Sequence, residues 1–179
     1  MLQTNQEKSF FDVSLNELRE FCKTSHTKEI KKLLEIYDEV FNLALASDGV
    51  SSIEKCQQLV DVFGNSVVPL MFAAGEYFSL ATKLSGLKVM LDRKAERGEN
   101  IKPALLALLK VKLDYADKKR DPSNQETVGI QNKEEFDFVN EQLVQSANLA
   151  QHLGEQTIYW TALSKKIHLQ LAGHQHAST

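Results

Sequence analysis

The stretch NKEEFDFVNEQLVQSANLAQHLGEQTIYWTALSKKIHLQLAG, residues 132–173, decides the fold class. Apolar or small side chains recur in it at steps of three and four, which is the period of an α-helix. These residues are Phe136, Val139, Leu143, Ala147, Ala150, Leu153, Thr157, Trp160, Ser164, Ile167 and Leu171. Because the register runs unbroken past Gly154, it favours one helix of about 40 residues, roughly 60 Å long. If Gly154 ends the helix instead, two antiparallel helices result.

The same period covers most of the remaining chain and predicts helices over residues 15–23, 28–47, 52–63, 66–97 and about 101–120. Ser14 with Glu17 forms a capping-box pattern, and Asn100 is a candidate cap for the fifth helix. Pro69 and Pro103 suit first turns, while Gly98 suits a helix end. Strand patterns are nearly absent. We therefore predict an all-α, antiparallel bundle of five or six helices, two or three of them unusually long.

Length and composition indicate one domain, residues 1–179, because 42% of the residues are hydrophobic and can form a core without disulfides or bound metal ions. Within it we expect a flexible N-terminal segment (1–13), a polar loop (121–131) and a frayed tail (173–179). No apolar run reaches the length of a membrane span, and no leader pattern opens the chain, so we expect a cytoplasmic protein. Cys22 and Cys56 lack metal-type spacing and are expected to be free thiols.

The local motifs of catalysis and cofactor binding are missing. The sequence has no GxGxxG, GxxxxGK[ST], HExxH, GxSxG or EF-hand pattern. His174 and His176 stand near the chain end, but two imidazoles fall short of the three or four ligands of a zinc site. The sequence therefore predicts a protein that is not an enzyme and that holds no cofactor or metal.

Two regions are candidate partner-binding sites. One is a row of small residues on the helix predicted over 66–97, namely Gly75, Ser79, Thr82 and Gly86. Interior glycines disfavour a helix, so this row indicates close packing, either of a neighbouring helix, which is the more common use, or of a ligand or partner. The other is the adjacent pair Tyr159 and Trp160, which point about 100° apart. Both are usually buried, but an exposed aromatic there would indicate a partner or lipid surface.

The charge is uneven along the chain. Residues 83–120 hold eleven Lys/Arg against five Asp/Glu, whereas the rest holds ten against nineteen. The basic residues alternate with acidic ones, which favours an ordinary solvated face over an anion-binding surface. A candidate anionic-surface set is Lys88, Arg93, Lys94, Arg97, Lys102, Lys110 and Lys112. Nucleic acid is not expected as a partner, because stacking aromatics are not interleaved with these charges.

These observations lead to one functional hypothesis and two alternatives. The hypothesis is a non-catalytic protein–protein interaction or regulatory module that self-associates through an exposed helix face. The first alternative is binding of an anionic membrane surface through the basic set. The second is binding of a small apolar ligand in the core of the bundle.

Overall fold

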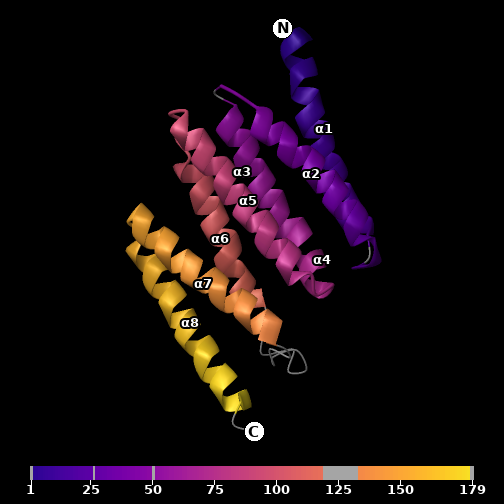
Figure 1. Ribbon diagram of the computed structural model, residues 1–179. Helices are drawn as coiled ribbons and strands as arrows, with labels where there is room; N and C mark the ends of the chain where they lie inside the picture. The colour runs from indigo at the N-terminus through magenta and orange to yellow at the C-terminus, as the bar shows by residue number, and fades with distance from the viewer. Residues whose placement is uncertain (1, 26, 50, 119–132, 178–179) are drawn as a thin grey trace. The chain divides into compact units, whose positions relative to one another are not determined.

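The all-α prediction is confirmed. The computed structural model describes residues 2–25, 27–49, 51–118 and 133–177, and over these ranges it contains helices and no strand (Figure 1). The helices are α1 (Leu2–Thr24), α2 (Ile30–Ala46), α3 (Ser52–Val62), α4 (Val68–Ala73), α5 (Tyr77–Glu96), α6 (Lys102–Lys118), α7 (Lys133–Leu153) and α8 (Gln156–Ala177). A short 3₁₀ turn (Thr27–Glu29) precedes α2, and a π-helical segment (Phe63–Val67) joins α3 to α4. The predicted loop 121–131 lies outside the described residues.

The N-terminal helix is longer than predicted. α1 begins at Leu2, so the prediction that the first helix starts at Ser14 is wrong. Phe11, Leu15 and Leu18 are buried at steps of four and three. This apolar spacing extends the helical face upstream of the capping-box pattern, because packing outweighs a local capping signal.

The helix break predicted between residues 63 and 66 is absent. Residues 52–73 form one uninterrupted helical run through Gly64 and Asn65, where a turn was predicted. Pro69 explains the π-helical segment, since its ring would clash with the carbonyl four residues earlier in a regular α-helix. The wider π turn, closed by a bond from the Val68 amide to the Phe63 carbonyl, accommodates the proline without ending the helix.

The break falls at Gly75 instead, which corrects the prediction of one helix over residues 66–97. Gly75 has a φ of +75°, a left-handed conformation that L side chains rarely adopt. The Glu76 amide donates to the Met71 carbonyl at 2.9 Å, and the Gly75 amide donates to the Phe72 carbonyl at 2.9 Å. These two bonds form a Schellman motif, which ends α4. Gly98 (φ +84°) ends α5 in the same way, as predicted.

The chain groups into two compact units, Met1–Leu108 and Leu109–Thr179, where the sequence predicts a single domain. In the first unit α1 packs on α2, and α2 packs on α3. Tyr37 of α2 lies at the centre of its core, with its ring 5.1 Å from that of Phe63. Other fully buried core side chains include Leu18, Leu33, Leu59, Met71, Leu80, Leu87, Met90, Leu91 and Leu108. At the start of α6 the Asn100 side chain accepts a bond from the Lys102 amide, as a cap does.

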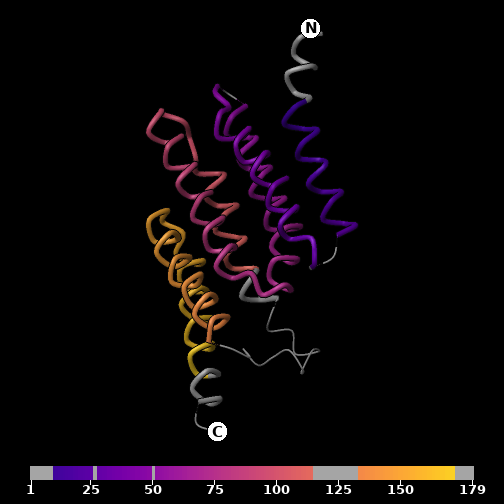
Figure 2. Tube along the Cα trace, turned by 45° about the vertical axis from the view of Figure 1, so that its right-hand side comes forward, coloured from indigo at the N-terminus to yellow at the C-terminus, as the bar shows by residue number. Residues whose placement is uncertain are grey.

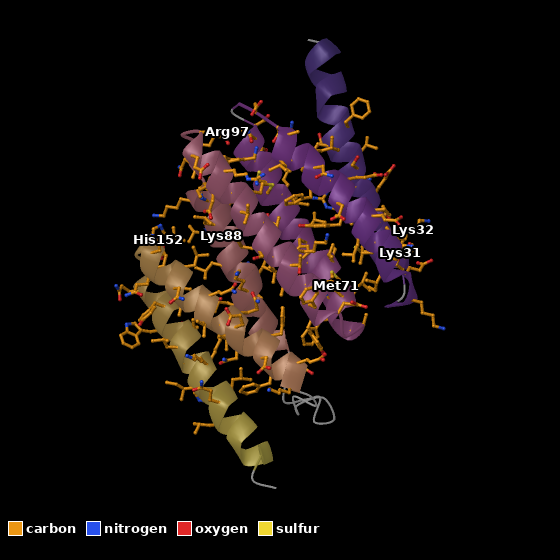
Figure 3. The ribbon with its side chains drawn as sticks, viewed as in Figure 1. Lys31, Lys32, Met71, Lys88, Arg97 and His152 are labelled. Atoms are coloured by element: carbon orange, nitrogen blue, oxygen red, sulfur yellow. The ribbon has the colours of Figure 1, made fainter. Side chains whose placement is uncertain are left out.

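The second unit contains an antiparallel hairpin of α7 and α8, which lie side by side in both views (Figure 1, Figure 2). The prediction of one continuous helix through Gly154 is therefore wrong, and the alternative of two antiparallel helices is confirmed. Gly154 has a φ of +74°, and the Glu155 amide donates to the Ala150 carbonyl at 2.9 Å, again a Schellman motif. His152 lies at this turn (Figure 3). At its other end α8 runs past Gly173 to Ala177, although a frayed tail was predicted there.

Candidate protein-binding surface

The helix α8 is apolar on two opposite faces. On one face Ala162 and Leu169 are 0% and 4% exposed, and they lie seven residues apart, which is two helical turns. On the opposite face Trp160, Ile167 and Leu171 are 63%, 56% and 60% exposed. A helix with apolar residues all round is normally buried all round. Among the described residues, only one of the two apolar faces is covered.

The exposed face follows a heptad spacing. Thr157, Trp160, Ser164, Ile167 and Leu171 are all exposed and are separated by steps of three, four, three and four. This alternation is the seam with which a helix packs along a second helix. We call these five residues the Trp160 face.

No exposed residue of α8 between positions 156 and 171 carries a formal charge, counting histidine as neutral. The exposed residues are Gln156, Thr157, Trp160, Thr161, Ser164, Ile167, His168, Gln170 and Leu171. The two lysines of this segment, Lys165 and Lys166, are half-buried. Depletion of charge is the compositional mark of the core of a protein interface, whereas solvent-facing helices are normally rich in Lys and Glu.

Several polar groups beside the Trp160 face bond to the backbone of the same helix. The Thr161 hydroxyl donates to the Thr157 carbonyl at 2.8 Å, and the Nδ1 of His168 donates to the Ser164 carbonyl at 2.7 Å. Because these groups are already bonded within the helix, covering them removes little hydrogen bonding with water. The face can therefore be covered by an apolar partner without leaving those groups unpaired.

The two adjacent aromatic residues that the sequence singled out differ in how far they are exposed. Their rings meet edge to face, with centroids 5.3 Å apart and an interplanar angle of 72°. Tyr159 is half-buried, whereas Trp160 points outward, so the more common arrangement of a buried pair does not occur. Ile167 and Leu171 belong to the apolar stripe predicted from the sequence, yet they lie at the surface. The sequence signal that could have found them is their register, because they lie one and two turns beyond Ser164 on the same helix face as Trp160.

The row of small residues predicted on one helix is not a continuous surface. Gly75 ends α4, so it does not share a helix with the other three. Ser79 is half-buried, and the exposed Thr82 donates its hydroxyl hydrogen to the Phe78 carbonyl at 2.9 Å. At Gly86 an added Cβ would lie 3.9 Å from the Cζ of Phe41, an ordinary contact. Gly75 is therefore explained by the helix end and Gly86 has room for a Cβ, so neither glycine shows the close packing that was inferred from the sequence.

The basic set is divided between the core and the surface. Lys94 and Lys112 are buried, so their ammonium groups do not face solvent. The Nζ of Lys94 donates to the Ser47 carbonyl at the end of α2, and that of Lys112 donates to Gln145 of α7. The prediction that these two lysines face solvent is therefore wrong, because a backbone carbonyl and a glutamine oxygen satisfy their charge inside the protein.

The remaining five basic residues lie at the surface, and two of them are paired. Lys88 forms an ion pair with Asp92 one turn further along α5, and Arg97 pairs with Asp48 at 3.0 Å. Figure 3 labels Lys88 and Arg97. Arg93, Lys102 and Lys110 are exposed. The carboxylates beside Lys88 and Arg97 reduce the positive potential that an anionic surface would meet.

A hollow of about 580 Å³ is open to solvent and is lined by Asp48, Gly49, Ile53, Arg97, Glu99 and Asn100. No group of three or more His, Cys, Asp or Glu suited to a metal ion occurs among the described residues. The side chains of His174 and His176 lie outside that part, so the sequence prediction about them is not tested.

Comparison with known proteins gives no relative from which a role could be transferred. No family model, curated protein or solved structure matches this chain. None of the described helices is long and apolar enough to cross a membrane.

Proposed function

We propose that this protein is a non-catalytic interaction module that binds an apolar helix of a partner on the Trp160 face. The observation that carries the proposal is the pair of opposite apolar faces on α8, of which the hairpin covers only the face of Ala162 and Leu169. A soluble helix with one covered and one open apolar seam is completed by another helix.

The size of the exposed apolar surface supports a specific partner rather than incidental exposure. Fully burying one large aliphatic or aromatic side chain stabilises by about 1.5–3 kcal/mol, and Trp160, Ile167 and Leu171 are each more than half exposed. Together they can therefore contribute roughly 3–5 kcal/mol, which is of the order of the lower estimates of the cost of association. A partner has to bring a comparable apolar face of its own for a stable complex to form.

Binding of an anionic membrane surface receives less support. Lys94 and Lys112 are buried, and Lys88 and Arg97 are neutralised by carboxylates. Helices that lie on membranes carry Lys and Arg on the polar side of their apolar face. The polar residues that flank the Trp160 face are Gln156, Thr161, His168 and Gln170, none of which is a permanent cation.

Crosslinking from the Trp160 face in the full chain tests the proposal. A photoreactive amino acid replaces Ile167 in one variant and Val89 in the control, since Val89 of α5 is similarly half exposed. In cell extract we expect a discrete crosslinked protein band from position 167, none from position 89, and loss of the band when Trp160→Glu is added. The proposal fails if position 167 gives no band, or if its bands persist with Trp160→Glu.

A further inference from the structure

We infer that the helix seated on the Trp160 face is α8 of a second copy of this chain, packed antiparallel. The inference rests on the proposed function and names its partner. Three observations carry it: the heptad register of the face, the absence of charge along its exposed side, and the order of large and small residues within it.

The order of side chains fits an antiparallel copy. In antiparallel helix pairs the two kinds of seam position face each other, so residues whose numbers sum to a constant lie opposite. With a sum of 331, Trp160 packs on Leu171 of the second copy and Ser164 packs on Ile167 of the second copy. Each contact occurs twice about a two-fold axis, and small Ser164 lies opposite the branched Ile167 side chain. The two contacts and their two-fold copies form four layers, and every residue in these layers is an exposed residue of the described helix.

The uncharged surface favours a copy of the same chain over a charged partner. Facing segments of two copies bring no like charges together, because the exposed residues from Gln156 to Leu171 carry none. A partner with Lys or Glu beside its seam would lose hydration without gaining an ion pair here. Gln156, Thr161 and Gln170 can form hydrogen bonds reciprocally with a copy. An antiparallel pair also opposes the two helix dipoles, whereas a parallel pair would place like ends together.

The contact area sets the expected strength. Four layers of one helix pair give an interface below the standard size of about 1,200–2,000 Å², which is typical of weak and reversible complexes. We therefore expect self-association with a dissociation constant of roughly 1–100 μM.

Sedimentation of the purified full chain tests the inference. Over a concentration series from about 1 to 300 μM, which brackets that range, the unchanged chain is expected to pass from monomer to dimer. Trp160→Glu and Ile167→Glu should remain monomers at every concentration, whereas the control Val89→Glu should dimerise as the unchanged chain does. Far-ultraviolet circular dichroism of each variant separates loss of dimer from loss of fold. Because Trp160 is the only tryptophan, its emission should shift to the blue as the dimer forms.

Disulfide trapping tests the orientation. Ser164→Cys and Ile167→Cys are made in separate chains of different tag length and mixed under mild oxidation. The antiparallel register predicts the mixed disulfide at least ten times more abundant than either disulfide between identical variants. A parallel pair would give the reverse, since each position would then face itself, and that result would overturn the inference.

The remaining outcomes distinguish failure of the inference from failure of the proposed function. If the chain stays monomeric and Trp160 is exposed to solvent, the inference that a second copy is the partner is overturned. A crosslink from position 167 to another protein would then still support the proposed function. A monomer whose Trp160 is shielded from acrylamide has its face covered within the chain, which overturns both. Trp160-dependent binding to vesicles of phosphatidylserine and phosphatidylcholine by a monomeric chain also overturns both, because the face would then bind lipid.

Discussion

The ammonium group of Lys94 donates a hydrogen bond of 2.7 Å to the carbonyl oxygen of Ser47, although the lysine is only 1% exposed. Ser47 is the C-cap residue of α2, and the Ser52 hydroxyl donates to the same oxygen at 3.1 Å. A cation at this position complements the negative end of the helix dipole. The charge of Lys94 therefore joins α5 to the end of α2 from inside the first unit.

Replacement of Lys94 by methionine should destabilise the protein by about 1.5–3 kcal/mol, because a charged hydrogen bond to a buried carbonyl is lost while the apolar stem is kept. Arg93→Met is the matched control, since Arg93 precedes Lys94 in the same turn but is exposed. Its effect should stay within about 0.5 kcal/mol. Urea unfolding followed by circular dichroism measures both variants. Equal stability of Lys94→Met and the unchanged chain would show that α2 does not depend on this charge.

Two glycines of similar appearance in the sequence should respond to alanine with opposite signs. Gly154 has a φ of +74° with open space around it, so Gly154→Ala should cost about 1–2 kcal/mol through backbone strain alone. Gly86 is helical, and its added Cβ would meet Phe41 at an ordinary 3.9 Å. Gly86→Ala should therefore stabilise the protein by up to about 1 kcal/mol. Thermal or urea unfolding of the two variants would contradict this if both moved in the same direction.

The glycines also show where the fold could be predicted from the sequence. The three-and-four spacing identifies most helical residues from residue 15 onward, because it reports which side chains share a face, but the first half of α1 was not predicted. It does not report the backbone angle of Gly75 or Gly154, and a two-residue reversal happens to preserve the register from Leu153 to Thr157. Hence the helical content is predicted correctly, whereas the position of the breaks is not. Pro69 adds to the difficulty, since a π turn lets the helix continue where Gly64 suggested a stop.

The candidate site could be predicted only in part. Adjacent aromatics cannot both occupy one stripe, so the sequence indicated that one of Tyr159 and Trp160 could be exposed, without indicating which. It assigned Ile167 and Leu171 to the core, because their register continued the buried stripe of α7. The hairpin instead buries Ala162 and Leu169, and the stripe predicted from the sequence faces outward on α8. Lys94 could not be recognised as buried, since its acceptor Ser47 lies 47 residues away and is a backbone atom.

The two thiols should react slowly in the folded protein. Burial raises the pKa of both Cys22 and Cys56 from 9 to about 11, and for Cys56 the nearby Lys94 ammonium opposes this effect while Glu99 adds to it. Only the thiolate reacts, so at pH 8 alkylation by iodoacetamide should be about a hundredfold slower than in the urea-unfolded chain. Cys56 should be slower than Cys22, because it is fully buried. Mass spectrometry of the labelled protein measures both sites, and equal fast labelling would contradict the burial.

The same pKa shifts predict how stability changes with pH. The unfolded chain loses its thiol protons near pH 9, whereas the folded chain retains them until about pH 11. Between these values the unfolded state binds fewer protons, so the thiols lower the free energy of unfolding as pH rises. They contribute no change below about pH 8, where both states keep their protons. Cys22→Ala should reduce the fall in the urea midpoint between pH 9 and pH 11.

Two ion pairs that join α2 and its C-terminal loop to α5 should differ in strength. The Lys83 ammonium lies 2.7 Å from Asp38, is 23% exposed and stands over the ring of Tyr37. Arg97 and Asp48 are 59% and 80% exposed. Asp38→Asn should therefore destabilise by about 0.5–1 kcal/mol, whereas Asp48→Asn should have an effect below about 0.5 kcal/mol, because water and salt screen the exposed pair.

A double-mutant cycle with Lys83→Met and Asp38→Asn isolates the energy of the Lys83–Asp38 pair. The ring of Tyr37 should preserve part of this energy in 1 M NaCl, because it holds the lysine in place. A coupling of zero at low salt would show that the 2.7 Å contact adds nothing to stability.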